Sequence, residues 1–198
     1  MWPWEHALFG YLVYSLFCRA YFREPPGEGE ALLVVFGSVL PDLIDKPLAW
    51  EFGVFPSGYA LAHSIFFAVP LAIAAGLLGR ALGDARAGLA FGVGYLLHLV
   101  GDVIPIYVRT GEVRFDHLLW PVVVVETHSL PPGLIGGIQG NLDPYLDELL
   151  SSEPSTYVLL QIGIAVGAFL LWLVDGMPGL RGLYGGVRRT VSAVARFT

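Results

Sequence analysis

The chain has 198 residues, of which 55% are hydrophobic and only 14% are charged, whereas soluble domains carry about 25% charged residues. Together with a mean hydropathy of +0.65, this composition predicts an all-α integral membrane protein with room for one domain. The net charge of −6 excludes nucleic acid as a partner, which would require clustered basic residues. Cys18 is the only cysteine, so an internal disulfide and a cysteine-based metal cluster are also excluded.

Five apolar segments approach the length of about 20 residues that a helix needs to cross a bilayer. Proline, glycine and charged clusters separate them, and they cover residues 5–22, 31–49, 59–79, 87–108 and 156–175. We therefore expect a polytopic helical bundle of about five transmembrane helices over residues 1–178. Glycines four residues apart, Gly88 with Gly92 and Gly163 with Gly167, predict surfaces where helices pack closely.

The region between the fourth and fifth segments is different. The apolar run Leu118–Val125 contains Pro121 and is too short to span, so it predicts a re-entrant or interfacial piece. Residues 127–155 form a polar excursion. Within it, Asp143–Leu150 predicts a short amphipathic helix with Pro144 at its first position, where the missing N–H costs nothing.

The basic residues predict the orientation, because cytoplasmic loops of membrane proteins carry the excess of Lys and Arg. An external N-terminus leaves three of these residues outside, Lys46, Arg109 and Arg114, and eight inside. The inner group comprises Arg19, Arg23, Arg80, Arg86, Arg181, Arg188, Arg189 and Arg196. We expect a multi-pass cell-membrane protein with the N-terminus outside, residues 127–155 on the outer face, and residues 179–198 as a basic cytoplasmic tail.

Six histidines and aspartates fall within or at the ends of the apolar segments. With this orientation they all lie in the outer half of the bilayer: His6, Asp42, Asp45, His63, His98 and Asp102. Ionisable groups at membrane depth are expensive and mark functional sites. Their common depth predicts one polar cavity that opens outward and could hold a metal. Asp116 and His117, in contrast, are expected to form a solvated pair at the outer surface.

Helical spacing supports this convergence. His98 and Asp102 are four residues apart, and Asp42 and Asp45 are three apart, so each pair shares a helix face and could clamp one cation. Pro41 disturbs the helix beside the first acid, and freed carbonyls at membrane depth are tolerated where they line a polar cavity. The alternative for each histidine is a purely structural hydrogen bond to another helix.

Four motifs in chain order carry a resemblance to a known family. They are His6 in an apolar first segment, Gly37-Ser-Val-Leu-Pro-Asp42, Ala62-His63-Ser64, and Tyr95-Leu-Leu-His98-Leu-Val-Gly-Asp102. In these motifs, over roughly residues 1–121, the chain resembles the YdjM-like family of membrane-bound, metal-dependent hydrolases. Met1-Trp-Pro-Trp-Glu-His6 and Asp45-Lys-Pro-Leu-Ala-Trp50 are most similar to haloarchaeal members.

The resemblance implies a polar centre with metal ligands at His6, Asp42, His63, His98 and Asp102. The chain departs from the family pattern in two places. The second acid, Asp45, comes three residues after the first where the family usually has two, so we expect it to serve as a base behind the ligands or as an alternate ligand. A His-Arg-Gly segment common in the family is replaced here by Ser57-Gly-Tyr-Ala.

Imidazole and carboxylate ligands suit zinc, manganese or iron, with zinc expected here. Such an ion lowers the pKa of its water from about 15.7 to about 7 and so supplies a nucleophile. The expected function is therefore metal-dependent hydrolysis of a phosphoester or lipid-like substrate. Two alternatives remain open: a protein that transports or senses a metal ion without turnover, and a structural anchor whose histidines only pack helices.

Overall fold

The computed structural model describes residues 1–127 and 129–180, and over these residues it contains six α-helices, one short 3₁₀ helix and no strand. The prediction of an all-α protein is confirmed. In chain order the elements are α1 (Pro3–Tyr21), α2 (Glu28–Trp50), α3 (Ile65–Ala81), α4 (Ala85–Thr110), η1 (Asp116–Leu118), α5 (Gly133–Leu149) and α6 (Thr156–Val174).

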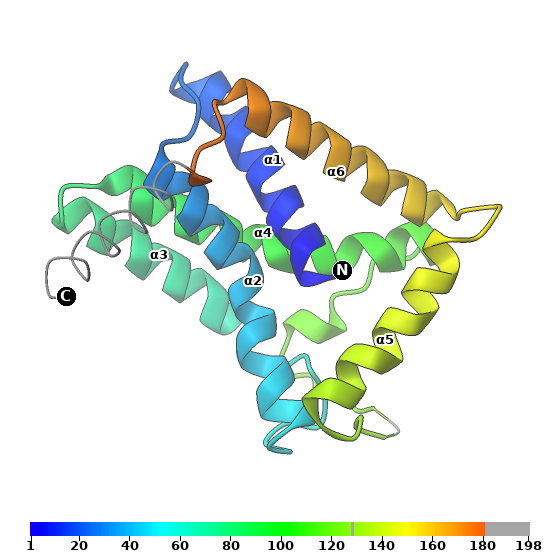
Figure 1. Ribbon diagram of the computed structural model, residues 1–198. Helices are drawn as coiled ribbons and strands as arrows, with labels where there is room; N and C mark the ends of the chain where they lie inside the picture. The colour runs from blue at the N-terminus through cyan, green and yellow to red at the C-terminus, as the bar shows by residue number, and fades with distance from the viewer. Residues whose placement is uncertain (128, 181–198) are drawn as a thin grey trace, which may run out of the picture.

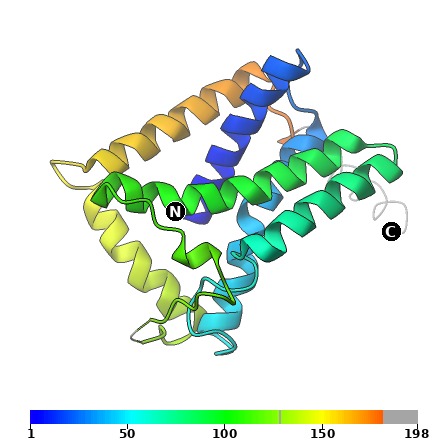
Figure 2. The ribbon, with the colours of Figure 1, turned by 180° about the vertical axis from the view of Figure 1, so that it is seen from behind.

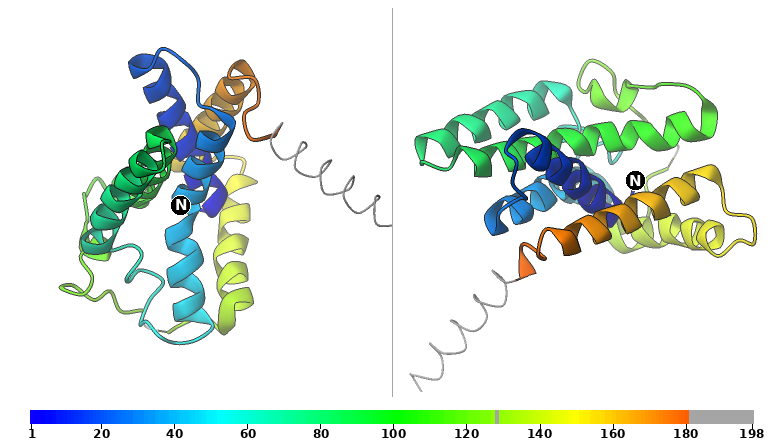
Figure 3. Two further views of the ribbon diagram at one scale, coloured as in Figure 1. Left: turned by 90° about the vertical axis from the view of Figure 1, so that its left-hand side faces the viewer. Right: turned by 90° about the horizontal axis from the view of Figure 1, so that it is seen from above.

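The helices form three layers. Helices α3 and α4 lie antiparallel on one side, α1 and α2 occupy the middle, and α5 and α6 cover the opposite side (Figures 1 and 3). Helix α4 contacts α1, α2, α3 and α6, and α1 contacts α2, α4 and α6. Seen from behind, α4 crosses the whole width of the molecule (Figure 2). The start of α1 is thereby brought against the middle of α4.

Two helices, α4 and α6, are long and apolar enough to cross a bilayer, judged by length and composition, and α3 is a shorter apolar helix. The remaining two expected spans, α1 and α2, are helical over 19 and 23 residues. Helix α2 also carries charged residues at its start and near its end. The five predicted segments are therefore helical, but only α4 and α6 among them are both long enough and apolar enough to cross a bilayer.

Glycines allow α4 to approach its neighbours closely. A methyl group on Gly94 would lie 2.2 Å from the Val34 carbonyl of α2, and one on Gly88 would lie 2.2 Å from the Ala75 carbonyl of α3. Gly92 also faces α3, so the packing surface predicted from Gly88 and Gly92 is confirmed. The prediction for Gly163 and Gly167 is met in part: nothing lies within 4 Å of the missing side chain of Gly163, whereas the Leu12 side chain of α1 lies 3.9 Å from that of Gly167. Of these two glycines on α6, only Gly167 therefore faces α1.

The predicted boundaries differ from the structure in two places. The third segment, predicted from residue 59, becomes helical only at Ile65 because Ser64 caps the helix by accepting a hydrogen bond from the Phe66 amide. The helix predicted at residues 143–150 instead begins at Gly133, and Pro144 lies inside it. Packing of α5 on α2, where Trp50 fills the space beside Gly137, supports the longer helix. The run 118–125 contains no α-helix: it begins with the last residue of η1 and continues as turns and irregular chain.

A buried carboxylate ties the end of α6 to α1. Asp175 accepts hydrogen bonds from Tyr11 Oη at 2.6 Å, from Ser15 Oγ at 2.5 Å and from Arg19 Nε at 2.9 Å. The three donors recur every four residues and so lie on one face of α1. The side chain of Asp175 is 0% exposed, and all of its donors come from a helix more than 150 residues earlier.

We expect Asp175→Ala to lower the free energy of unfolding by about 3 kcal/mol, because removing one partner of a buried charged cluster leaves the others unpaired. This value is at the low end of the usual range of about 3–5 kcal/mol, because the Arg19 side chain is 37% exposed. Tyr11→Phe removes a single hydrogen bond and should cost about 1 kcal/mol. Thermal unfolding in detergent, followed by circular dichroism, measures both variants. Equal stability of Asp175→Ala and the wild type would contradict the expectation.

Candidate metal centre

The structure brings together all six histidines and aspartates singled out in the sequence. They come from the first turns of α1, the second half of α2, the turn before α3 and the middle of α4. All six are buried: His6, Asp42, Asp45, His63, His98 and Asp102 have between 0% and 6% of their surface exposed. The predicted segment 59–79 would place His63 inside a helix, but His63 lies in the turn that precedes α3, because that helix begins at Ile65.

The centre is built around two imidazole rings whose Nε2 atoms face each other at 3.0 Å. The other nitrogen of each ring has a hydrogen-bond acceptor: His63 Nδ1 lies 2.8 Å from Asp45 Oδ2, and His98 Nδ1 lies 2.7 Å from the Ser38 carbonyl oxygen. A carbonyl or carboxylate oxygen can only accept, so each Nδ1 carries a proton and each ring turns its Nε2 toward the centre. Two Nε2 atoms at 3.0 Å need a positive charge between them, either a shared proton or a metal ion.

Two carboxylate oxygens complete this group. Asp42 Oδ1 lies 3.4 Å from His63 Nε2 and 3.8 Å from His98 Nε2. Asp102 Oδ2 lies 3.5 and 3.4 Å from the same two nitrogens. Tetrahedral zinc with bonds of about 2.0–2.1 Å separates its ligand atoms by about 3.3–3.5 Å. Two groups of three residues have ligand atoms close enough to hold an ion, Asp42 with His63 and His98, and His6 with His98 and Asp102. No described protein atom forms a hydrogen bond with Asp102 Oδ2.

His6 lies beside this group. Its ring stacks on His98 with centroids 3.7 Å apart, and its Nε2 lies 3.2 Å from Asp102 Oδ1. Neither of its ring nitrogens has a partner in hydrogen-bond geometry among the described residues. Position 101 must be glycine to admit the ring, since a methyl group there would lie 2.8 Å from His6 Nδ1. The Asp102 carboxylate thus faces His6 with one oxygen and the other histidines with its second.

Asp45 has a different place from the other acids. Its carboxylate accepts hydrogen bonds from the backbone amides of Ala60, Ala62 and His63 at 2.9–3.1 Å, in addition to the bond from His63 Nδ1. The Asp42 and Asp45 pair was expected to clamp a cation. In the structure the pair instead holds the His63 ring between its two carboxylates, because Asp45 faces the turn before α3.

Two supporting groups were not identified from the sequence. The Ser38 carbonyl orients His98, and Tyr95 Oη donates a 2.7 Å hydrogen bond to the Ala62 carbonyl, which fixes the turn that carries His63. The sequence could not predict the role of the Ser38 carbonyl, because every residue has a backbone carbonyl.

The expectation that His117 is a solvated surface residue is wrong. His117 is buried, it packs edge-on against Tyr59, and burial lowers its pKa. The burial of His117 depends on how the 112–125 segment folds back.

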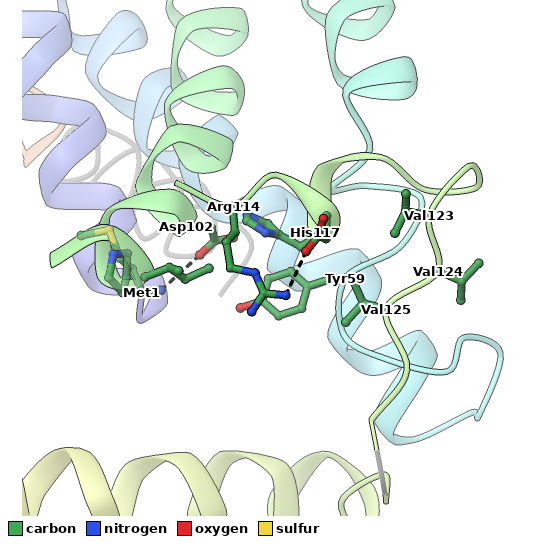
Figure 4. A pocket seen from close by; sticks show the side chains of 11 residues that line it. Met1, Tyr59, Asp102, Arg114, His117, Val123, Val124 and Val125 are labelled. Carbon is green, nitrogen blue, oxygen red and sulfur yellow. Dashed lines mark hydrogen bonds and ion pairs between the residues drawn. The ribbon is translucent and has the colours of Figure 1, made fainter. Parts of the chain in front are cut away.

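Two cavities reach the centre. One has a volume of about 490 Å³ and is lined by Asp102, Tyr59, His117 and Arg114. Figure 4 shows these side chains around one opening, with the Val123–Val125 segment beyond them. The other cavity has a volume of about 660 Å³, lies beneath α5, and reaches Asp42 and Lys46. Tyr59 lines both cavities, so its ring stands between the two routes to the buried donors.

Two positive groups lie next to the carboxylates. Lys46 Nζ is 2.6 Å from Asp42 Oδ2, and the Met1 amino nitrogen is 3.1 Å from Asp102 Oδ1. Each contact uses the carboxylate oxygen that points away from the two facing Nε2 atoms. Asp42 Oδ1 and Asp102 Oδ2 therefore stay directed at the centre.

Comparison with known proteins identifies the family. The profile of the YdjM inner membrane protein family matches residues 1–176, well beyond the 1–121 region that carries the motifs. No curated protein and no solved structure matches the chain. Since the match includes the first turns of α1 and every histidine and aspartate of the centre, the chain belongs to the YdjM inner membrane protein family.

Proposed function

We propose that the protein is a membrane-embedded, metal-dependent hydrolase that acts on a phosphoester. The observation that carries the proposal is the pair of buried Nε2 atoms 3.0 Å apart, each on a ring that holds its proton at Nδ1. We assign His63, His98, Asp42 and Asp102 as the ligands of one divalent ion. His6, on the other oxygen of Asp102, completes the set and could hold part of a second ion.

The donor set favours zinc, with manganese or iron as alternatives, because magnesium and calcium prefer sites made entirely of oxygen ligands. When bound, such an ion polarises a phosphoryl oxygen and acidifies water. The residues behind the ligands prepare the site. Asp45 and the Ser38 carbonyl fix which nitrogen of each ring faces inward, an arrangement typical of metal-binding histidines. We therefore propose that Asp45 acts through His63 and does not itself contact the substrate.

The proposed topology keeps five spans, α1–α4 and α6, with the N-terminus outside. Large apolar side chains are exposed along each of these helices, including Leu16, Phe36, Leu77, Val100 and Leu170, and exposed apolar patches of this kind mark contact with lipid or a partner. Helix α5 then lies on the outer face. The proposed tail at 179–198 is cytoplasmic, and its residues 181–198 lie outside the described part of the chain.

A lipid or lipid-like phosphoester is the proposed substrate class. The larger cavity joins the polar centre at Asp42 to apolar walls that include Leu43, Trp50 and Leu134. A pocket of this size that combines an apolar lining with a few polar groups is typical of small-molecule sites. Lys46 lies where it could contact a phosphate next to the centre.

Metal removal tests the proposal. We expect detergent-purified protein to contain about one or two equivalents of zinc, manganese or iron, and to hydrolyse a phosphoester lipid. Chelation should abolish the turnover, and zinc should restore it. Elemental analysis and release of the head group measure the two properties. Bound metal with cation flux and no turnover would favour transport, whereas folded protein without metal would favour the structural alternative.

A further inference from the structure

The cavity of about 660 Å³ beneath α5 has a second polar end, away from the metal centre. There Glu5 of α1 and Gln161 of α6 line its wall, beside Tyr157. Their exposed fractions are 5% and 6%. The same cavity reaches Asp42 and Lys46, so one molecule could contact both ends.

Both side chains have unused hydrogen-bonding capacity. The Oε1 and Nε2 atoms of Gln161 and the Oε1 atom of Glu5 have no hydrogen-bond partner among the described residues. The other oxygen of Glu5 accepts from the Trp2 amide at 2.7 Å and from Tyr157 Oη at 3.4 Å. Buried polar groups of folded proteins are nearly always paired. The unpaired atoms therefore point to a ligand that supplies the missing partners.

The charge of the cavity indicates what kind of ligand this is. Its described residues carry three cationic groups, and each is next to another carboxylate. Lys46 Nζ lies 2.6 Å from Asp42, Arg109 Nη2 lies 2.7 Å from Glu148, and the Met1 amino nitrogen lies 3.1 Å from Asp102. No ion pair joins Glu5 to any of the three. The negative charge reaches Tyr145 of α5, whose pKa is raised by burial and by Glu5.

Aromatic rings surround the same end. Trp2 and Tyr145 line the cavity with their ring centroids 5.8 Å apart, and Tyr157 lies beside them. A carboxylate among aromatic faces suits an ammonium group, which gains from the charge and from cation–π contact. Gln161 adds an acceptor for an N–H group.

We infer that the cavity beneath α5 binds a phosphoester of a primary amino alcohol, with its ammonium group at Glu5 and Gln161 and its phosphate toward Lys46. This inference rests on the proposed function only for the position of the phosphate. The volume matches the range of about 300–1,000 Å³ typical of ligand pockets. The apolar wall at Leu43 and Leu134 accommodates the glycerol end of such a molecule.

Binding is measured on full-length, detergent-purified protein after chelation of metal, so that no turnover takes place. Quenching of tryptophan fluorescence is titrated with phosphatidylethanolamine, phosphatidylglycerol and soluble glycerophosphoethanolamine. We expect phosphatidylethanolamine to bind the wild type at least about tenfold more tightly than phosphatidylglycerol, because a hydrogen bond to a charged group is worth that factor or more. Glu5→Gln keeps the acceptor for the Trp2 amide and should remove the preference.

A control variant, Glu112→Gln, changes an exposed acid outside the cavity and should keep the preference. Equal affinity of the wild type for the two lipids, or an unchanged preference in folded Glu5→Gln, would overturn the inference. Selective binding without hydrolysis after zinc is restored would overturn the proposed function and leave this site standing. Tight binding of glycerophosphoethanolamine identifies a soluble ligand, and binding of the lipid alone identifies a membrane one.

Discussion

His98→Ala is expected to abolish metal binding and to reduce phosphoester hydrolysis by at least about a thousandfold. His98 belongs to both groups of side chains that could hold an ion, the one with Asp42 and His63 and the one with His6 and Asp102. Its loss removes an Nε2 ligand from each. An ion contributes several kcal/mol to the transition state, and each 1.4 kcal/mol is about tenfold in rate.

Elemental analysis beside a hydrolysis assay tests this expectation. His117→Ala is the matched control for metal content, because His117 is also a buried histidine but its nitrogens belong to neither group. It should keep the metal of the wild type. Retention of the metal by folded His98→Ala would rule out the assigned ligand set. Circular dichroism establishes that the variant is folded, since the Ser38 carbonyl also loses its partner.

Asp45→Asn is expected to weaken zinc binding by about 10–100-fold, the usual effect of removing the carboxylate behind a metal-binding histidine. An amide has one acceptor oxygen where Asp45 uses two, and its NH₂ group would face backbone N–H donors of Ala60, Ala62 or His63. The His63 ring is then free to turn its proton toward the centre. Loss of the buried negative charge should also lower the free energy of unfolding by about 3 kcal/mol.

Competition with a zinc chelator gives the affinity, and thermal unfolding gives the stability. Asp143→Asn makes the same chemical change at an exposed position of α5 and should leave both values as in the wild type. If Asp45 were a base that touches the substrate, Asp45→Asn would lose turnover while keeping its zinc affinity. That result would refute the orienting role proposed here.

The helix spacing in the sequence was a good guide where both partners lie on one helix. His98 and Asp102 were predicted to share a face, and their side chains lie 3.4 Å apart. The same reasoning placed Asp42 and Asp45 together, but it could not show that they enclose a histidine from another segment. Asp42 lies 3.4 Å from His63 Nε2, whereas Asp45 lies 2.8 Å from Nδ1.

The excursion between α4 and α6 was the least predictable region. Pro144 favoured a helix start at that position, yet α5 extends over both sides of it because Trp50 and Gly137 pack together. The sequence also did not predict that Glu5 and Gln161 lie close together. The two residues are on different helices, and the packing of α1 against α6 beside α5 places them in one cavity.

The sequence by itself determined the membrane class, the all-α fold and the set of histidines and aspartates, because hydropathy and helical periodicity are local properties of the chain. Only the tertiary structure decided which nitrogen of each histidine faces inward, which acid points at the centre and which polar atoms remain unpaired. These depend on contacts between segments up to about 150 residues apart, such as Tyr157 with Glu5. Burial gives such contacts their energetic weight, since a polar group removed from water must find its partner within the protein.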